Sequence, residues 1–241
     1  MSRLYLLVEG HTEEAFVKRL LSPHYARLGL YMTPIIAQTS PGHKGGLLRY
    51  AKLRPQLERL CKQDSGAWVS TLFDLYGLPA DFPGKSEPAW PQQGSGHQKA
   101  AFLEWHMAQD IGRRNFLPHL MVYEYEALLF SKPECFAEWM EDTPHKAKAL
   151  NALLGVRRHC SPEEINDSPE TSPSKRIKAA MPGYQKAFHG PLIACEIGLE
   201  AIRRECPHFN AWLCKLETLK EGGGGEGCPL ATTDSRNRQQ K

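Results

Sequence analysis

The stretch from Leu4 to Leu21 reads LYLLVEGHTEEAFVKRLL. Its first five residues, Leu4 to Val8, form a continuous apolar run, which is typical of a strand buried on both faces of a sheet. After a turn that begins at Glu9, apolar residues recur at helical spacing from Glu13 to Leu21, and two acids stand in the first turn of that helix. The stretch therefore predicts a strand, a tight turn and a helix, which is the opening unit of an α/β protein.

The same alternation continues through the first half of the chain. Further strands are predicted at Tyr31 to Gln38, Trp68 to Phe73 and Leu120 to Tyr123. A helix is predicted over Leu47 to Lys62, with a bend near Pro55. The fold class expected is α/β, with a mainly parallel four-stranded sheet flanked by helices.

The second half of the chain has helical periodicity. The predicted domains are an α/β domain over 1–130, a helical lobe packed on it over 131–219, and a glycine-rich, disordered tail over 220–241. A proline- and glycine-rich loop of unassigned role spans Gly77 to Gly96. The helices expected in the lobe cover Cys135 to Met140, His145 to Leu154, Leu192 to Arg204 and Phe209 to Leu219.

Composition narrows the class of protein. A chain of 241 residues with 41% hydrophobic residues can bury one substantial core. No apolar run is long enough for a membrane span and no signal peptide is recognisable, so we expect a cytoplasmic protein that does not enter the membrane. Seven cysteines without a CxxC pair, and histidines that never reach HExxH spacing, predict neither a disulfide framework nor a zinc site.

Two acids follow apolar strands directly. Glu9 comes after the first predicted strand and Asp74 after the third. Ligands collect at the carboxyl ends of parallel strands, and Mg²⁺ binds through one or two carboxylates, waters and phosphate oxygens. The pair could thus hold Mg²⁺, with Mn²⁺ as a substitute. The alternative is structural, with Glu9 capping the next helix and Asp74 starting a turn.

Several motifs together resemble one family. The glutamate and glycine after the first strand are similar to the opening motif of TOPRIM domains, the catalytic fold of topoisomerases, primases and OLD-type nucleases. The chain resembles in particular a bacterial TOPRIM-like branch of unassigned function, and the resemblance runs to about Leu219. It implies a TOPRIM-like Rossmannoid catalytic domain over 1–130. The motifs are LLVEGHTEEAFV at Leu6 to Val17, LFDLYGLP at Leu72 to Pro79, YEYEALLF at Tyr123 to Phe130, SPSKRI at Ser172 to Ile177, YQKAFHG at Tyr184 to Gly190 and CPHFNAWL at Cys206 to Leu213.

The chain departs from the TOPRIM pattern at one metal ligand. Tyr76 stands where the DxD motif has its second aspartate. Glu124 or Glu126 could replace that acid, and Glu126 is favoured because the helix beginning at Ala127 would hold it rigidly. Two alternatives stay open: Glu126 only complements the helix dipole, or the site binds without cutting.

Positive charge is also needed, because a phosphodiester transition state gathers negative charge on its oxygens. Lys175, Arg176, Lys178 and Lys186 lie in a run without acids and are predicted to clamp phosphate or nucleic acid. The alternative is a solvated helix face. Lys44, in the sequence GHKGG, is a weaker candidate because the P-loop spacing is lacking.

The resemblance implies a Mg²⁺-dependent nuclease that hydrolyses phosphodiesters of DNA or RNA, with tRNA among the candidates. Glu9, Asp74 and Glu126 would be its catalytic and metal-binding residues, and Glu124 a further ligand. The family also implies an effector of bacterial defence against phage, restrained by an ATPase partner. The other hypothesis is a non-catalytic nucleic-acid-binding or regulatory subunit of such an ATPase complex. A homodimer is one option for the oligomeric state.

Overall fold

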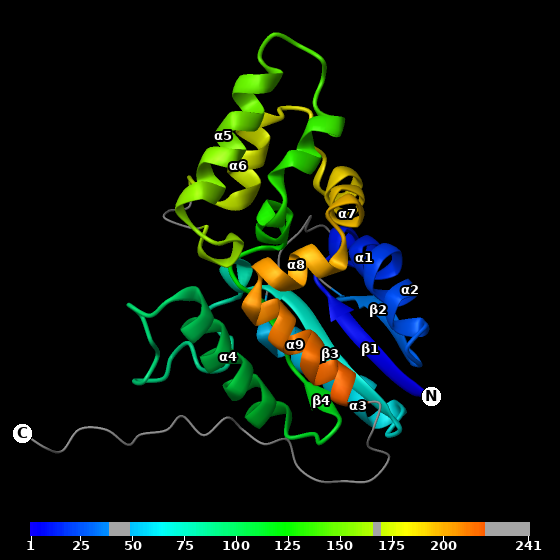
Figure 1. The fold of residues 1–241 in the computed structure, drawn as a ribbon. Coiled ribbons are helices and arrows are strands. Elements are labelled where there is room, and N and C mark those ends of the chain that lie inside the picture. The colour runs from blue at the N-terminus through cyan, green and yellow to red at the C-terminus, as the bar shows by residue number, and fades with distance from the viewer. Residues whose placement is uncertain (39–48, 166–169, 220–241) are drawn as a thin grey trace, which may run out of the picture.

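The computed structural model describes residues 1–38, 49–165 and 170–219, and these fold around a five-stranded sheet (Figure 1). In this part of the chain every strand pairing is parallel. The strand order is β2-β1-β3-β4, and β5 also pairs with β3. The predicted α/β class with a mainly parallel sheet is confirmed, with one additional two-residue strand, β4. The strands are β1 (Ser2–Val8), β2 (Leu30–Ile36), β3 (Ala67–Asp74), β4 (Phe116–Leu117) and β5 (Leu120–Met121).

β1 lies between β2 and β3, which explains its continuous apolar sequence. Successive side chains of a strand point to opposite faces, so both faces of a central strand need apolar residues. Leu4 and Leu6 belong to the hydrophobic cluster on one face, and Leu7 belongs to the cluster on the other.

Helices cover both faces of the sheet. On one face α3 and α4 pack against Leu7, Val69 and Phe73. On the other, α1, α8 and α9 pack against β1 and β3, and α8 and α9 cross in front of the strands in Figure 1. The helices are α1 (His11–Phe16), α2 (Ser22–Ala26), α3 (Tyr50–Gln63), α4 (Gly96–Ile111), α5 (Lys146–His159), α6 (Pro173–Ala180), α7 (Lys186–Ile197), α8 (Leu199–Glu205) and α9 (Pro207–Thr218).

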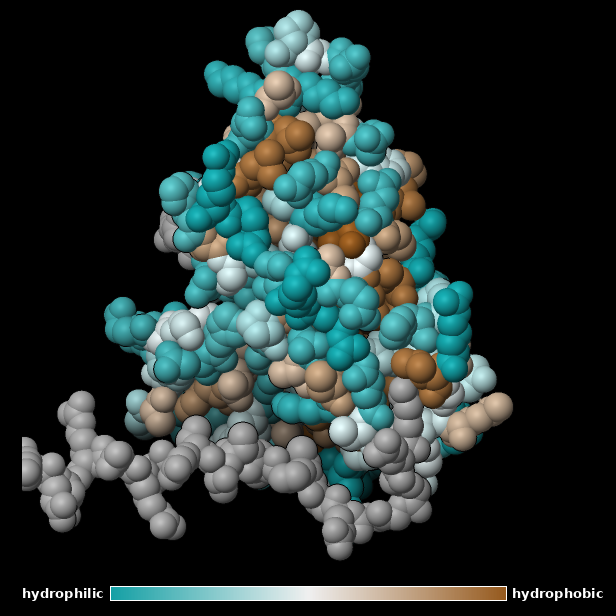
Figure 2. Space-filling view, in the orientation of Figure 1, coloured by the Kyte–Doolittle hydropathy of each residue, from teal (hydrophilic) through white to brown (hydrophobic). Residues whose placement is uncertain are grey.

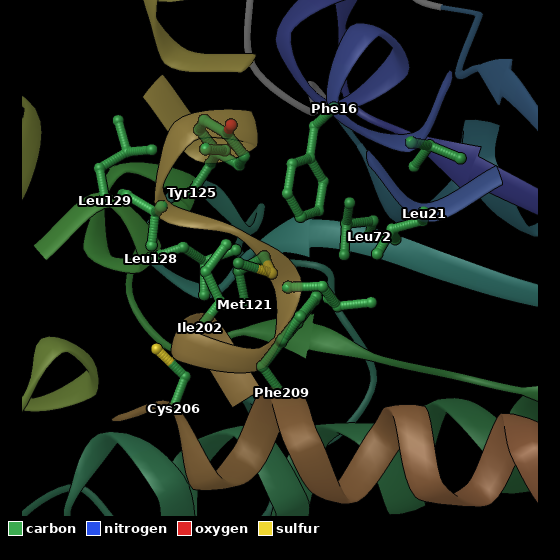
Figure 3. Close-up of a cluster of buried hydrophobic side chains, with 14 of the residues drawn as sticks. Phe16, Leu21, Leu72, Met121, Tyr125, Leu128, Leu129, Ile202, Cys206 and Phe209 are labelled. Carbon is green, nitrogen blue, oxygen red and sulfur yellow. The ribbon is translucent and has the colours of Figure 1, made fainter. Parts of the chain in front are cut away.

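The larger hydrophobic cluster joins segments that are far apart in the sequence. Phe16 of α1, Leu72 of β3, Ile202 of α8 and Phe209 of α9 point toward one another (Figure 3). The cluster continues into α5, α6 and α7, which form the upper part of the molecule in Figure 1. The helical region is thus attached to the sheet through a shared apolar core.

Several predicted helices have different boundaries or types. The helix predicted over Leu192 to Arg204 is divided into α7 and α8 at Gly198, which has φ 81°. That conformation is open to glycine and costly for other residues. The segment Pro133–Trp139 is a 3-10 helix, η4, and further 3-10 turns are η2 (Leu75–Gly77), η3 (Tyr125–Ser131) and η5 (Pro162–Glu164). Between α1 and α2 the chain makes a π-helical turn, η1 (Val17–Leu21).

The face of the molecule in Figure 2 is mostly hydrophilic, and hydrophobic residues show over α5 and α6. Within the described ranges, no helix has the length and apolar character that crossing a membrane requires. The predicted tail over 220–241 lies outside the described residues.

A tight helix contact near Lys186 can be tested with glycine substitutions. A Cβ added at Gly190 of α7 would lie 3.0 Å from the Tyr125 ring and 3.0 Å from the Tyr184 hydroxyl. We expect Gly190→Ala to lower the free energy of unfolding by about 1 kcal/mol, because overpacking costs ~1–3 kcal/mol and the gain in helix propensity returns only part of it. Urea unfolding followed by circular dichroism measures the change.

Gly155→Ala is the matched control, because Gly155 is also helical and a Cβ there would meet nothing within 4 Å. This substitution should raise the free energy of unfolding by roughly 0.5–1 kcal/mol. Equal effects of the two substitutions would contradict the described packing of α7.

Candidate active site

The acids that follow β1 and β3 lie at the same edge of the sheet. Val8 pairs with Leu72, so Glu9 and Asp74 leave adjacent parallel strands at their carboxyl ends. Gly77 of η2 approaches Glu9 closely, and a Cβ added there would lie 3.9 Å from the Glu9 carboxylate. The turn after β3 therefore folds back over Glu9.

A strained turn brings a third acid to this edge. β5 pairs with the end of β3, and Tyr123 then adopts φ 68°, which is costly for a residue with a side chain. Its carbonyl accepts a hydrogen bond from the Tyr76 amide at 2.9 Å. The Tyr125 amide donates to Asp74 Oδ1 at 2.9 Å. These two contacts fix the start of η3, which carries the fully buried Glu126.

Lys186 supplies the positive charge of the cluster. It is the first residue of α7, and its Nζ lies 3.0 Å from Glu126 Oε2 and 3.5 Å from Asp74 Oδ2. The Tyr184 hydroxyl donates a longer bond, 3.5 Å, to Glu126 Oε1. The sequence pattern had placed Lys186 in a run of four basic residues, and the structure brings it to the acids.

Burial makes the negative charge of these acids costly. It raises the pKa of Glu126 to about 8, and burial with the nearby Asp74 charge raises the pKa of Glu9 to about 7. Burial also raises the pKa of Asp74, although Lys186 opposes this. Glu9 Oε2 is buried without a hydrogen-bond partner among the described residues. That oxygen could serve as a ligand for a cation.

Sequence reasoning missed one acid of the cluster. Glu13 is buried, and its pKa is raised to about 7 by burial and by Asp74. Glu13 Oε2 accepts a hydrogen bond from the Gly10 amide at 2.9 Å. Its position in the first turn of a helix indicated only a capping role, so no local pattern distinguishes it as part of the site.

Glu124 points elsewhere. Its carboxylate accepts hydrogen bonds from the backbone amide and the hydroxyl of Ser174, at the start of α6. Tyr76, at the position of the second DxD acid, is 53% exposed. Of the two acids considered for the third ligand, Glu126 is therefore the one that shares the Lys186 ammonium with Asp74.

Three of the other predicted phosphate-binding residues, Lys175, Arg176 and Lys178, form no ion pair with these acids in the described part of the chain. Lys175 and Lys178 are exposed on α6. The Arg176 Nε donates to the Thr171 carbonyl. Lys44 falls outside the described residues.

A second polar cluster joins Glu104, His119 and His208, which come from three separate segments. Glu104 Oε1 lies 2.8 Å from His208 Nε2 and 3.4 Å from His119 Nδ1. Hydrogen bonds from the two histidines outweigh burial and lower the pKa of Glu104 to about 2. Sequence spacing gave no indication of this cluster.

Oxygen ligands from Glu9, Asp74 and Glu126 fit Mg²⁺ or Mn²⁺, which are bound by carboxylates and waters. Metal binding must displace the protons that the raised pKa values retain. We expect affinity for Mn²⁺ to rise between pH 6 and about 8.5, well above the range in which ordinary carboxylates titrate. Calorimetric titration across this range measures the slope.

Glu126→Gln should flatten the upper part of this pH profile, because the group with a pKa of about 8 is removed. An affinity that is constant above pH 6 in the wild-type protein would contradict the assignment of these acids as ligands.

Glu124 and Glu126 form a matched pair for mutation. We expect Glu124→Ala to lower the free energy of unfolding by ~1 kcal/mol, because the amide at the start of α6 loses its acceptor. Binding of Mn²⁺ should change less than twofold. Glu126→Ala should instead abolish Mn²⁺ binding, and loss of binding in both variants would show that Glu124 is also a ligand.

Comparison with protein families gives one match. A family model described as "Domain of unknown function (DUF4276)" matches residues 8–217, a range that includes both polar clusters. No curated protein and no solved structure matches the chain. Because the model spans most of the 241 residues, the chain belongs to the DUF4276 family.

Proposed function

We propose that this protein is a Mg²⁺-dependent nuclease whose metal is held by Glu9, Asp74 and Glu126. One observation carries the proposal: the buried carboxylates of Asp74 and Glu126 meet the half-buried Glu9 at the carboxyl edge of parallel strands, and the buried oxygen Glu9 Oε2 has no hydrogen-bond partner in the described part of the chain. Buried carboxylates are normally paired or bind metal. The single ammonium of Lys186 cannot balance all of them.

A bound Mg²⁺ would polarise a phosphoryl oxygen and lower the pKa of a water molecule. The protein contributes rigid positions for the ligands. Asp74 is fixed by the Tyr125 amide, and Glu126 by Lys186 and Tyr184. Glu9, which lacks such contacts at Oε2, would act either as a further metal ligand or as the general base that accepts a proton from an attacking water.

The position of Lys186 favours phosphodiester chemistry over a site that only binds a cation. Its side chain is 38% exposed although its ammonium contacts buried acids. The partial exposure of this side chain leaves it accessible to a phosphate from the solvent side. Lys186 can then stabilise charge that develops on the phosphate oxygens in the transition state.

The substrate is proposed to be DNA or RNA, and the ATPase partner and the role in defence against phage belong to the same proposal through the TOPRIM resemblance. One observation favours the second function, a non-catalytic regulatory subunit. Tyr76 replaces an acid of the TOPRIM motif and points toward solvent, so the site has fewer ligands at that turn.

The deciding experiment measures cleavage of plasmid, single-stranded DNA and tRNA with Mg²⁺, Mn²⁺ or EDTA. We expect metal-dependent cleavage that falls at least about 10²-fold in Glu9→Gln, Asp74→Asn and Lys186→Met, since loss of one electrostatic contact to a transition state commonly costs that much. The assay is repeated with the ATPase partner that the proposal implies.

Asp64→Asn is the matched control. Asp64 precedes β3 at the opposite end of the sheet and is paired with Arg3. It should cleave like the wild-type protein. If the wild-type protein binds Mn²⁺ through these acids but cuts none of the substrates in any condition, the regulatory function holds.

A further inference from the structure

We propose that Glu104, His119 and His208 form a zinc site, separate from the acidic cluster and independent of the proposed nuclease function. The three side chains come from α4, from the connection between β4 and β5, and from the start of α9. One potential ligand atom from each lies within 4.8 Å of the others. Two imidazoles and a carboxylate are a ligand set that zinc binds with a water in the fourth position.

The distances fit a metal site. Glu104 Oε1 is 2.8 Å from His208 Nε2 and 3.4 Å from His119 Nδ1. Zinc bonds of 2.0–2.1 Å in tetrahedral geometry place neighbouring ligand atoms about 3.3 Å apart. Small rotations of the side chains would therefore admit the ion without movement of the backbone.

The ligands are held by surrounding contacts, as metal ligands commonly are. The His119 ring is buried and stacks on Trp212, with ring centroids 4.5 Å apart and planes 9° apart. Its backbone amide and carbonyl both bond to the Thr71 hydroxyl. The Leu120 amide donates to Glu104 Oε1 at 2.8 Å.

His208 is fixed through its backbone. Glu163 of η5 accepts hydrogen bonds from the His208 and Phe209 amides, each at 2.9 Å, and so takes the place of an N-cap for α9. The same carboxylate lies 3.0 Å from His97 Nε2. The ring of His208 is therefore presented to Glu104 from a rigid helix start.

The competing structure is a metal-free cluster in which Glu104 accepts hydrogen bonds from both histidines. That arrangement leaves His119 Nε2 buried without a hydrogen-bond partner in the described ranges. Zinc bound at Nδ1 would put a proton on that atom and leave it equally unpaired. A zinc–ligand set contributes far more free energy than one unpaired N–H costs, so this atom does not decide against the ion.

The site would fix the segment that leads to the acidic cluster. His119 directly precedes β5, and β5 leads through Tyr123 to Glu126. Zinc would join this segment to α4 and α9 and would thereby stabilise the fold around the proposed active site.

The test measures zinc in protein expressed without a polyhistidine tag, by plasma mass spectrometry after dialysis in excess Mg²⁺. We expect one zinc per chain in the wild-type protein and in the double variant Glu9→Gln, Asp74→Asn. His208→Gln should lose it, whereas His97→Gln, whose ring lies 6.1 Å from that of His208, should retain it. The double variant separates this site from the proposed nuclease site.

A second readout does not depend on the variants folding. Wild-type protein stripped of metal should show the visible absorption of tetrahedral Co²⁺ when that ion is added, and zinc should abolish it and raise the melting temperature. The proposal would be overturned if wild-type protein contained no more zinc than the His208→Gln variant. It would also be overturned if folded wild-type protein gave no tetrahedral Co²⁺ spectrum.

Discussion

Burial of several carboxylates beside one ammonium is the constraint on which this edge of the molecule depends. The pKa of Glu9 is raised to about 7 and that of Glu126 to about 8, so the folded protein holds protons that the unfolded chain releases near pH 4.5. Because the folded state binds more protons in this range, stability falls as pH rises from about 4.5 toward 8. The cluster thus costs stability at neutral pH unless a cation joins Lys186. Such a cost is typical of sites kept for function.

Rigid, well-packed elements hold these acids in place despite the cost in stability. Two of the acids leave central or near-central parallel strands, which cannot shift without breaking the sheet. The third depends on the left-handed conformation of Tyr123 and on the bond from the Tyr125 amide to Asp74. Tyr125, which follows the turn, packs in the hydrophobic cluster with apolar residues of α1, α8 and α9 (Figure 3).

The sequence predicted the positions of the acids correctly where they directly follow a recognisable strand. The apolar run before Glu9 and the one before Asp74 predicted both strands and hence the proximity of their acids. The helix predicted to begin at Ala127 favoured Glu126 over Glu124, but the sequence could not show that Ser174 binds Glu124. Likewise, a basic run cannot tell which of its members turns inward, because that depends on where α7 meets the sheet.

The histidine cluster was beyond sequence reasoning for a different reason. Spacing rules recognise ligands that share one helix or one hairpin. Glu104, His119 and His208 lie on three elements, and the last is 89 residues beyond the second by their numbering (208 − 119). They meet because α4 packs in the smaller hydrophobic cluster with Leu120 and α9 packs in the larger one with Met121, so that the two helices flank β5 from opposite faces of the sheet, next to His119.

Both polar clusters depend on the register of β5. Phe73 pairs with Leu120 and Asp74 with Met121, so His119 stands just before the pairing and Glu126 just after the turn that follows it. A slip of one residue would reverse the direction of every side chain in this short strand. With only two residues in the ladder, β5 cannot set its register by backbone pairing alone. The bonds of Thr71 to His119 at one end, and of Asp74 to Tyr125 at the other, supply the missing specificity. The Asp74 carboxylate of the acidic cluster and the Thr71 hydroxyl are therefore also the restraints that keep this strand in place.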